Sequence, residues 1–217
     1  MYLICMKGYY NMDLTSPRTI RNIQEQFGFT FKKGLGQNFL TARNILEEIV
    51  DAAEIESGVI EVGPGFGVLT SELAQNSDKV VTIEIDERLI DVLDYTLAEY
   101  DNVKIINEDI LKLDLKKVID DEFKGEKVSI AANLPYYITT PIITKLLEEK
   151  LPIKNIVVMV QKEVAERMSA KPSTKDYGAI TVLCQYYTEP SIVANVPASL
   201  FVPPPKVDSA VLKLKVL

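Results

Sequence analysis

Short apolar runs alternate with helix-spaced apolar positions through the middle of the chain. The runs are rich in Val and Ile and stand at residues 59–62, 80–85, 103–106, 128–132 and 156–160. Runs of this kind are typical of strands buried on both faces. Apolar residues recur every three or four positions at 69–74, 89–97, 142–147 and 164–168. Strands separated by helices in this order predict an α/β fold, with helices on both faces of a mostly parallel sheet.

The N-terminal part predicts two helices before the first strand. Ser16 and Pro17 offer an N-cap and a first helical residue, and Gly28 ends the apolar face that follows. A second helix is predicted from a Thr41 cap to Ala53.

The C-terminal part changes character. A helix is predicted over 179–187, followed by strands at 191–196 and 209–216 that are joined through a proline-rich link without a helix. Two strands connected in this way pair antiparallel or lie apart. We therefore expect a seven-stranded sheet that ends in an antiparallel hairpin.

Composition excludes several kinds of chemistry. The 217 residues include no His, which excludes a Ser-His-Asp triad, a Cys-His pair and a His-ligated metal. Cys5 and Cys184 lie too far apart in sequence for a metal-ligand spacing, so no metal is expected. Two thiols without a signal peptide fit the cytoplasm, and no apolar run approaches the ~20 residues that span a bilayer.

The net charge of −7 conceals a division along the chain. Residues 1–43 carry a net charge of +4, and the remaining residues carry −11. A basic segment on an acidic body can hold a polyanion locally, although a merely solvated terminus is the alternative.

A glycine-rich turn, Glu61-Val-Gly63-Pro-Gly65-Phe-Gly67, follows the first predicted strand of the sheet. Its G-x-G-x-G spacing differs from the G-x-G-x-x-G of dinucleotide-binding proteins, which weakens a nicotinamide interpretation. Glu84 ends the second strand of this series, where a carboxylate can accept hydrogen bonds from ribose hydroxyls. Asp109 follows the third strand and could receive an adenine amino group. A tight turn with two solvated acids is the alternative interpretation.

The segment Asn133-Leu134-Pro135-Tyr136 directly follows the fourth strand. The Asn133 side-chain oxygen and the Leu134 carbonyl are acceptors at the carboxyl edge of the sheet. Pro135 stiffens the turn, and Tyr136 offers a stacking face. This combination suits a planar base with an exocyclic amine.

At this point the chain resembles the small-subunit (16S) rRNA adenine dimethyltransferases. The resemblance rests on the motifs above together with Lys33-Gly-Leu-Gly-Gln-Asn38-Phe-Leu40, Gln161–Arg167 and Phe201–Ser209. It implies a Rossmann-like class I fold that uses S-adenosylmethionine and releases S-adenosylhomocysteine. It also implies a monomer that dimethylates two adjacent adenines near the 3′ end of small-subunit rRNA, in a precursor of the 30S subunit.

The resemblance also implies roles for individual residues. Asn38 and Leu40 would contact the methionine end of the donor, Gly63 and Gly65 would form the turn beneath it, and Glu84 and Asp109 would bind its ribose and adenine. Asn133 would touch both the methyl group and the target amine, and Phe201 would close on the target base opposite Tyr136. The candidates for phosphate contacts are Arg18, Lys32 and Lys33.

The resemblance covers residues 18–217 and suggests an N-terminal extension and helix over 1–30 before a catalytic domain over 31–217. The small helical domain with which family members continue is expected to be absent. Three alternatives remain open: a large-subunit rRNA methyltransferase of the erythromycin-resistance type, a ribosome-assembly factor that acts by binding, and a nicotinamide dehydrogenase. Enzymes that methylate protein glutamine or DNA amines usually have Pro where Leu134 stands.

Overall fold

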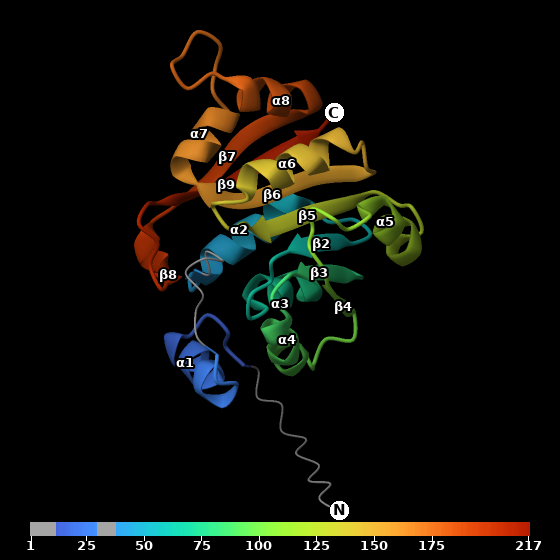
Figure 1. The fold of residues 1–217 in the computed structure, drawn as a ribbon, viewed down its shortest axis with the longest axis vertical. Coiled ribbons are helices and arrows are strands. Elements are labelled where there is room, and N and C mark those ends of the chain that lie inside the picture. Colours follow the sequence, from blue (N-terminus) through green and yellow to red (C-terminus); the bar gives the residue numbers. More distant parts are fainter. Residues whose placement is uncertain (1–11, 30–37) are drawn as a thin grey trace, which may run out of the picture.

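The computed structural model describes residues 12–29 and 38–217 of the chain. Seven strands form its main sheet (Figure 1) in the spatial order β4-β3-β2-β5-β6-β9-β7. In this order they are Val103–Asn107 (β4), Val80–Glu84 (β3), Val59–Val62 (β2), Val128–Asn133 (β5), Ile153–Gln161 (β6), Ser209–Val216 (β9) and Thr188–Val196 (β7). Two further short strands, Phe39–Leu40 (β1) and Phe201–Val202 (β8), pair antiparallel with each other.

The strands β4, β3, β2, β5 and β6 are all parallel, whereas β9 is antiparallel to both β6 and β7. This confirms the predicted parallel sheet with a C-terminal antiparallel hairpin. The hairpin enters the sheet with β9 on the inside and β7 at the edge. Residues 209–212 at the start of β9 are all buried, which fits an interior strand, whereas most of β7 is exposed or half-buried.

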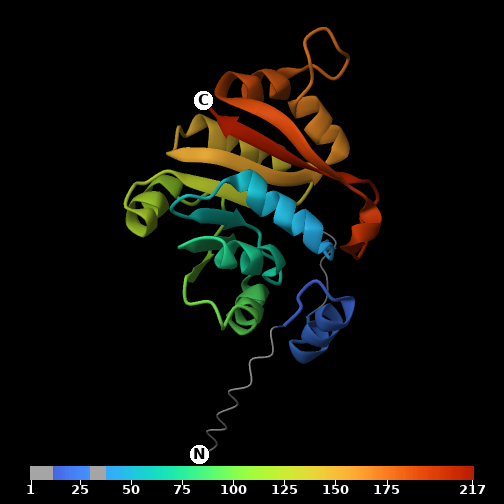
Figure 2. The same ribbon diagram turned by 180° about the vertical axis from the view of Figure 1, so that it is seen from behind.

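Helices cover both faces of the sheet (Figures 1 and 2). One apolar cluster joins one face to Arg43–Ala53 (α2), Val68–Gln75 (α3) and Ile90–Thr96 (α4). A second cluster joins the other face to Leu115–Phe123 (α5), Thr139–Glu148 (α6), Lys162–Met168 (α7) and Ala179–Tyr187 (α8). Two short 3₁₀ turns stand at Glu87–Leu89 (η2) and Ala198–Leu200 (η3). Within the described ranges, no helix has the length and apolarity needed to span a membrane.

The helix predicted after Ser16 is confirmed as Pro17–Gln26 (α1). Its buried residues Ile20 and Ile23 belong to the same cluster as α2 and α3. The division of the chain at residue 30 stays a prediction.

The predicted Thr41 cap is wrong, because α2 is preceded by Ala42 as its N-cap residue. The Thr41 hydroxyl instead donates to the Leu200 carbonyl oxygen at 2.8 Å, and the Thr41 N–H donates to the same oxygen. The Thr41 side chain therefore bonds to a residue 159 positions away in the sequence and does not cap α2. Thr41 thus ties the start of α2 to the segment that leads into β8.

Helix α5 was not among the predicted helices, although its apolar residues Leu115, Val118, Ile119 and Phe123 have helical spacing and are buried. Asp114 caps this helix by accepting a hydrogen bond from the Lys117 N–H. The two-residue strands β1 and β8 were not predicted either, because so short a pairing leaves no periodic pattern.

Candidate active site

The glycine turn after β2 adopts a backbone that other residues rarely take. Gly63 and Gly65 have φ values of 70° and 59°, in the left-handed region that glycine tolerates best. A Cβ at Gly65 would lie 2.6 Å from the Phe39 ring, so a side chain there would collide with it. A Cβ at Gly63 would meet nothing within 4 Å, so this backbone borders open space.

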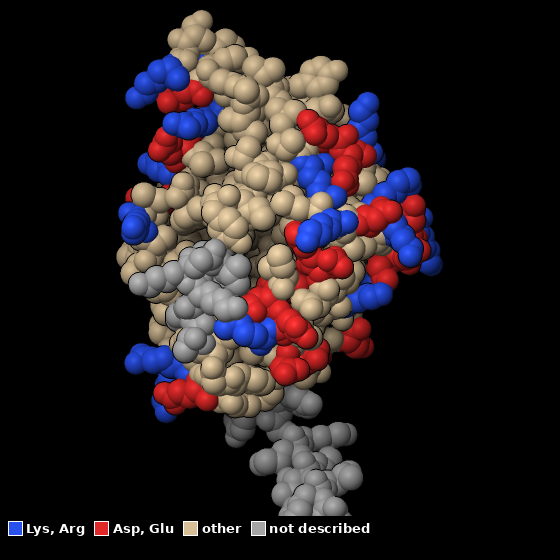
Figure 3. Space-filling view, in the orientation of Figure 1, with Lys and Arg blue, Asp and Glu red and all other residues tan. Residues whose placement is uncertain are grey.

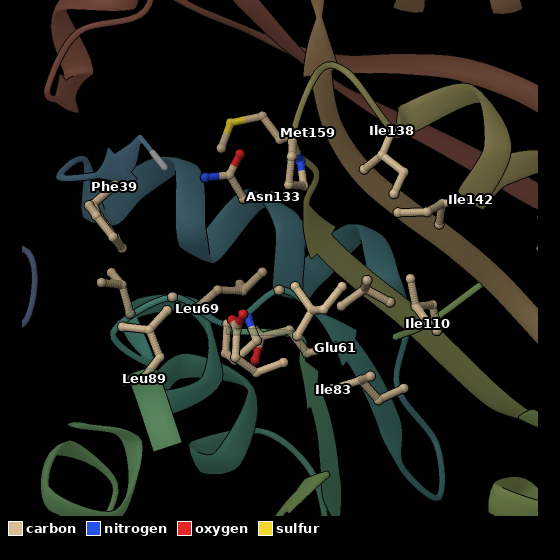
Figure 4. A pocket seen from close by; sticks show the side chains of 18 of the residues that line it. Phe39, Glu61, Leu69, Ile83, Leu89, Ile110, Asn133, Ile138, Ile142 and Met159 are labelled. Atoms are coloured by element: carbon tan, nitrogen blue, oxygen red, sulfur yellow. The ribbon is translucent and has the colours of Figure 1, made fainter. Parts of the chain in front are cut away.

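This open space is a cavity at the carboxyl ends of β2, β3, β4 and β5 (Figure 4), the crevice in which α/β sheets bind ligands. Its empty volume is about 1050 Å³, a figure that includes the part open to solvent. Eight of the predicted site residues line it together: Asn38, Leu40, Gly63, Gly65, Glu84, Asp109, Asn133 and Pro135.

Two buried carboxyl groups, Glu61 and Glu84, form part of the cavity wall. Glu61 is 1% exposed and its Oε2 accepts a hydrogen bond from the Thr70 hydroxyl at 2.5 Å. Burial raises the pKa of Glu61 to about 8 despite that hydrogen bond. Burial also raises the pKa of Glu84 to about 7, while N–H donors such as that of Asp86 oppose the rise. At neutral pH Glu61 therefore keeps its proton, whereas Glu84 is partly ionised and can accept hydrogen bonds from a hydroxyl-bearing ligand.

We expect Glu61→Gln to weaken the dependence of stability on pH. Folded Glu61 keeps a proton that the unfolded chain releases above its ordinary pKa of 4.5. The contribution of Glu61 to the free energy of unfolding therefore falls as the pH rises from about 5 to about 8. Glutamine does not titrate, so the variant should lose less stability over this range and exceed the wild type at the alkaline end. Urea denaturation across this pH range measures the difference, and parallel pH profiles would contradict the assignment.

One end of the cavity is apolar, and acids stand beside it. Figure 4 shows Ile110 on one side and Ile138 and Ile142 on the other, with Ile83 below. Asp109 lies next to Ile110, and its Oδ1 accepts a hydrogen bond from the Leu111 N–H at 3.0 Å. Such an end suits a flat aromatic ring with a polar edge.

Asn133 ends β5 and extends over the cavity (Figure 4). Its Nδ2 donates to the Asn38 carbonyl oxygen at 3.0 Å. Because the nitrogen is engaged in this way, the Oδ1 atom is the end of the amide that can accept a hydrogen bond from a ligand.

Pro135 also lines the cavity, whereas the other predicted catalytic residues, Leu134, Tyr136 and Phe201, lie outside its lining. The Leu134 side chain is 1% exposed, and its N–H donates to the Met159 carbonyl oxygen. The Tyr136 hydroxyl lies 2.7 Å from Ser209 Oγ, so this half-buried ring is fixed to the start of β9. Phe201 is 2% exposed and belongs to the core, so in this conformation it presents no free ring face to a target base.

Of the predicted phosphate contacts, Arg18 is exposed on α1, whereas Lys32 and Lys33 lie outside the described residues. Figure 3 shows a largely uncharged area in the middle of this face, with acidic side chains gathered below and to its right. A polyanion would therefore meet less repulsion over the uncharged area than over the acidic side.

Comparisons with known proteins show the family of this chain. The profile described as ribosomal RNA adenine dimethylase matches residues 28–216. A ribosomal RNA small subunit methyltransferase A from Bacillus mycoides is 55% identical over 205 residues, which cover 93% of this chain and 70% of that protein. The chain belongs to the ribosomal RNA adenine dimethylase family. The predicted family is thereby confirmed, and the chain is an rRNA adenine methyltransferase.

Solved structures show the family's fold as well. A dimethyladenosine transferase from Plasmodium falciparum is 36% identical with a TM-score of 0.73, covering 82% of this chain and 63% of that one. The 23S rRNA methyltransferase ErmE is 33% identical with a TM-score of 0.70, covering 83% and 70%. The predicted Rossmann-like methyltransferase fold is confirmed. The chain spans less than two thirds of the length of the Plasmodium enzyme.

Several cavity residues had no role in the sequence-based prediction of this rRNA adenine dimethylase site, among them Glu61, Ile85, Ile110 and Tyr137. Ile85 and Ile110 directly follow Glu84 and Asp109, so their nearness to a predicted acid was an available signal. Glu61 belongs to the glycine motif itself, at the end of a buried strand. For Tyr137 there was no such signal, because nothing in the sequence indicates that Tyr137 and not Tyr136 lines the cavity.

Proposed function

We propose that this chain transfers methyl groups from S-adenosylmethionine to the exocyclic amines of two adjacent adenines near the 3′ end of small-subunit rRNA. Each adenine receives two methyl groups, and S-adenosylhomocysteine is the other product. The substrate is a precursor of the 30S subunit in the cytoplasm, and the chain acts as a monomer. The observation that carries this proposal is the Asn133 amide, whose nitrogen is bonded to the Asn38 carbonyl oxygen so that its own oxygen can accept a hydrogen bond in the cavity.

The cavity fits the donor in shape and chemistry. Gly63 presents bare backbone to open space, where the methionine end would lie beside Asn38 and Leu40. The Glu84 carboxylate would accept hydrogen bonds from both ribose hydroxyls, and Asp109 would accept one from the adenine amino group. The apolar end formed by Ile83 and Ile110 suits the adenine ring.

The protein activates a weak nucleophile. The donor supplies a methyl group on a positively charged sulfur. An adenine amine needs no prior deprotonation, but its lone pair is conjugated into the ring. Asn133 Oδ1 and the Leu134 carbonyl oxygen would accept its hydrogens, favour a pyramidal nitrogen and stabilise the positive charge that it gains. After each transfer the methylated nitrogen would lose one proton to solvent, so one hydrogen remains for the second transfer.

Tyr136 would fix the direction from which the target base approaches. Its hydrogen bond with Ser209 holds the ring, and stacking on an aromatic ring contributes roughly 1–3 kcal/mol per base. We assign the stacking role to Tyr136 alone, because Phe201 is buried among core residues. Phe201 instead pairs with Leu40 across β1 and β8, which holds a cavity residue in position.

Methylation of purified ribosomal particles tests the proposal. Undermethylated 30S subunits and free 23S rRNA would be incubated separately with the chain and labelled donor, and the products digested for mass spectrometry. We expect dimethyladenosine at two neighbouring positions of the small-subunit RNA and none in 23S rRNA. Label in 23S rRNA alone would favour a large-subunit enzyme, and no label in either RNA despite donor binding would favour an assembly factor.

A further inference from the structure

Two large apolar side chains at the cavity are left open to solvent. Tyr137 is 57% exposed and Ile85 is 54% exposed, and both line the cavity. The other large apolar side chains that are exposed in the described part of the chain lie away from it. Exposed apolar surface at the rim of a ligand site is commonly covered when the ligand binds.

The two adjacent tyrosines of the turn between β5 and α6 lie in different environments. Tyr136 is half-buried and bonded to Ser209, outside the cavity lining, whereas Tyr137 lies at the cavity. Ile138 follows Tyr137 and lies near Ile142 at the apolar end of the cavity (Figure 4). The chain thus directs Tyr136 and Tyr137 to separate surfaces.

We propose that Tyr137 covers the adenine of the donor, packing on the purine at the apolar end of the cavity. This inference rests on the proposed function and adds a binding residue to it. Tyr137 combines an aromatic face in the cavity lining with a large solvent-exposed area that a ligand can cover. Stacking on an aromatic ring is tolerant of base identity, so Tyr137 adds affinity while Asp109 reads the amino group.

The same turn carries Asn133, four residues before Tyr137. Closure of Tyr137 on the donor also steadies this turn, but the Asn133 amide is already held by Asn38. Loss of the Tyr137 ring should therefore weaken donor binding more than it slows the methyl transfer itself.

A fluorescent probe at this position reports the contact directly, because the chain contains no Trp. In Tyr137→Trp, S-adenosylhomocysteine and 5′-methylthioadenosine should both change the tryptophan emission, and methionine should not, because it lacks the purine. The control is Tyr186→Trp on α8, where the native side chain is 74% exposed and away from the cavity. Its emission should not respond to any of the three compounds.

Calorimetry supplies the affinity. Tyr137→Ala should bind S-adenosylhomocysteine about 10- to 100-fold more weakly, as expected for a lost stacking contact, while Tyr137→Phe and Tyr186→Ala should bind it as the wild type does. At saturating donor, kcat of Tyr137→Ala should stay within a few-fold of the wild type.

Two results would overturn this inference and leave the proposed function standing. One is an unchanged affinity of Tyr137→Ala for S-adenosylhomocysteine. The other is a constant tryptophan emission from Tyr137→Trp under conditions in which calorimetry shows that this variant binds the compound. Failure of the wild-type chain to bind S-adenosylhomocysteine would overturn both the inference and the proposed function.

Discussion

Replacing Asn133 by Ala should slow methyl transfer about 10²–10³-fold at saturating donor, by analogy with the loss of one preorganised group that stabilises transition-state charge. Asn133 Oδ1 is the free end of an amide whose nitrogen is bonded to Asn38. Its removal deletes the acceptor that would stabilise the developing charge on the target nitrogen. Single-turnover methylation of small-subunit RNA measures this step without product release.

Asn195→Ala is the matched control, because Asn195 is exposed on the edge strand β7 and does not line the cavity. It should methylate at the wild-type rate. Calorimetry with S-adenosylhomocysteine should show that Asn133→Ala still binds the product, which separates a chemical defect from loss of the donor site. A wild-type single-turnover rate for Asn133→Ala would remove this residue from the mechanism.

Replacing Glu84 by Ala should weaken donor binding by about two orders of magnitude. The carboxylate would accept two ribose hydroxyl hydrogens, and a hydrogen bond to a charged group contributes roughly 1.5–3 kcal/mol. Burial raises the pKa of Glu84 to about 7, so donor affinity of the wild-type chain should also increase as the pH rises from about 6 to about 8. Calorimetric titration with S-adenosylhomocysteine at several pH values measures both effects.

Glu87→Ala controls for the loss of a negative charge near the site. Glu87 is exposed in η2, three residues beyond Glu84, and does not line the cavity. Its donor affinity and pH profile should match those of the wild type. A Glu84→Ala variant that binds S-adenosylhomocysteine as tightly as the wild type would mean that the ribose is held elsewhere.

Local sequence patterns predicted most of the sheet. Strands β2 and β9 have the predicted bounds, and β3, β4 and β5 differ from prediction by one residue. Strands β2, β3 and β5 are mostly apolar and buried, so burial and sequence carry the same information there. The edge strand β4 is half-buried or exposed and was recognised by its Val and Ile residues. Strand β9 was recognised by its alternating pattern. The start of β6, at Ile153–Asn155, was missed because Lys154 and Asn155 interrupt its apolar run.

The site residues that stand at or just after the end of a parallel strand could be predicted from the sequence. Glycines after β2 and acids after β3 and β4 come together at one edge, because parallel strands bring their carboxyl ends to the same side. The predicted stacking role of Phe201 depended instead on a loop whose path has no local signal. The structure places that ring in the core, next to β1.

The sequence by itself determined the α/β class, the order of strands and acids, and the family. Tertiary structure decided which distant groups meet: Asn133 and Asn38, 95 residues apart, and Tyr136 and Ser209, 73 residues apart. It also decided that Tyr136 and Tyr137 serve different surfaces. The physical reason is that local patterns record whether a side chain is buried, whereas its partner depends on how separate segments pack after the chain has folded.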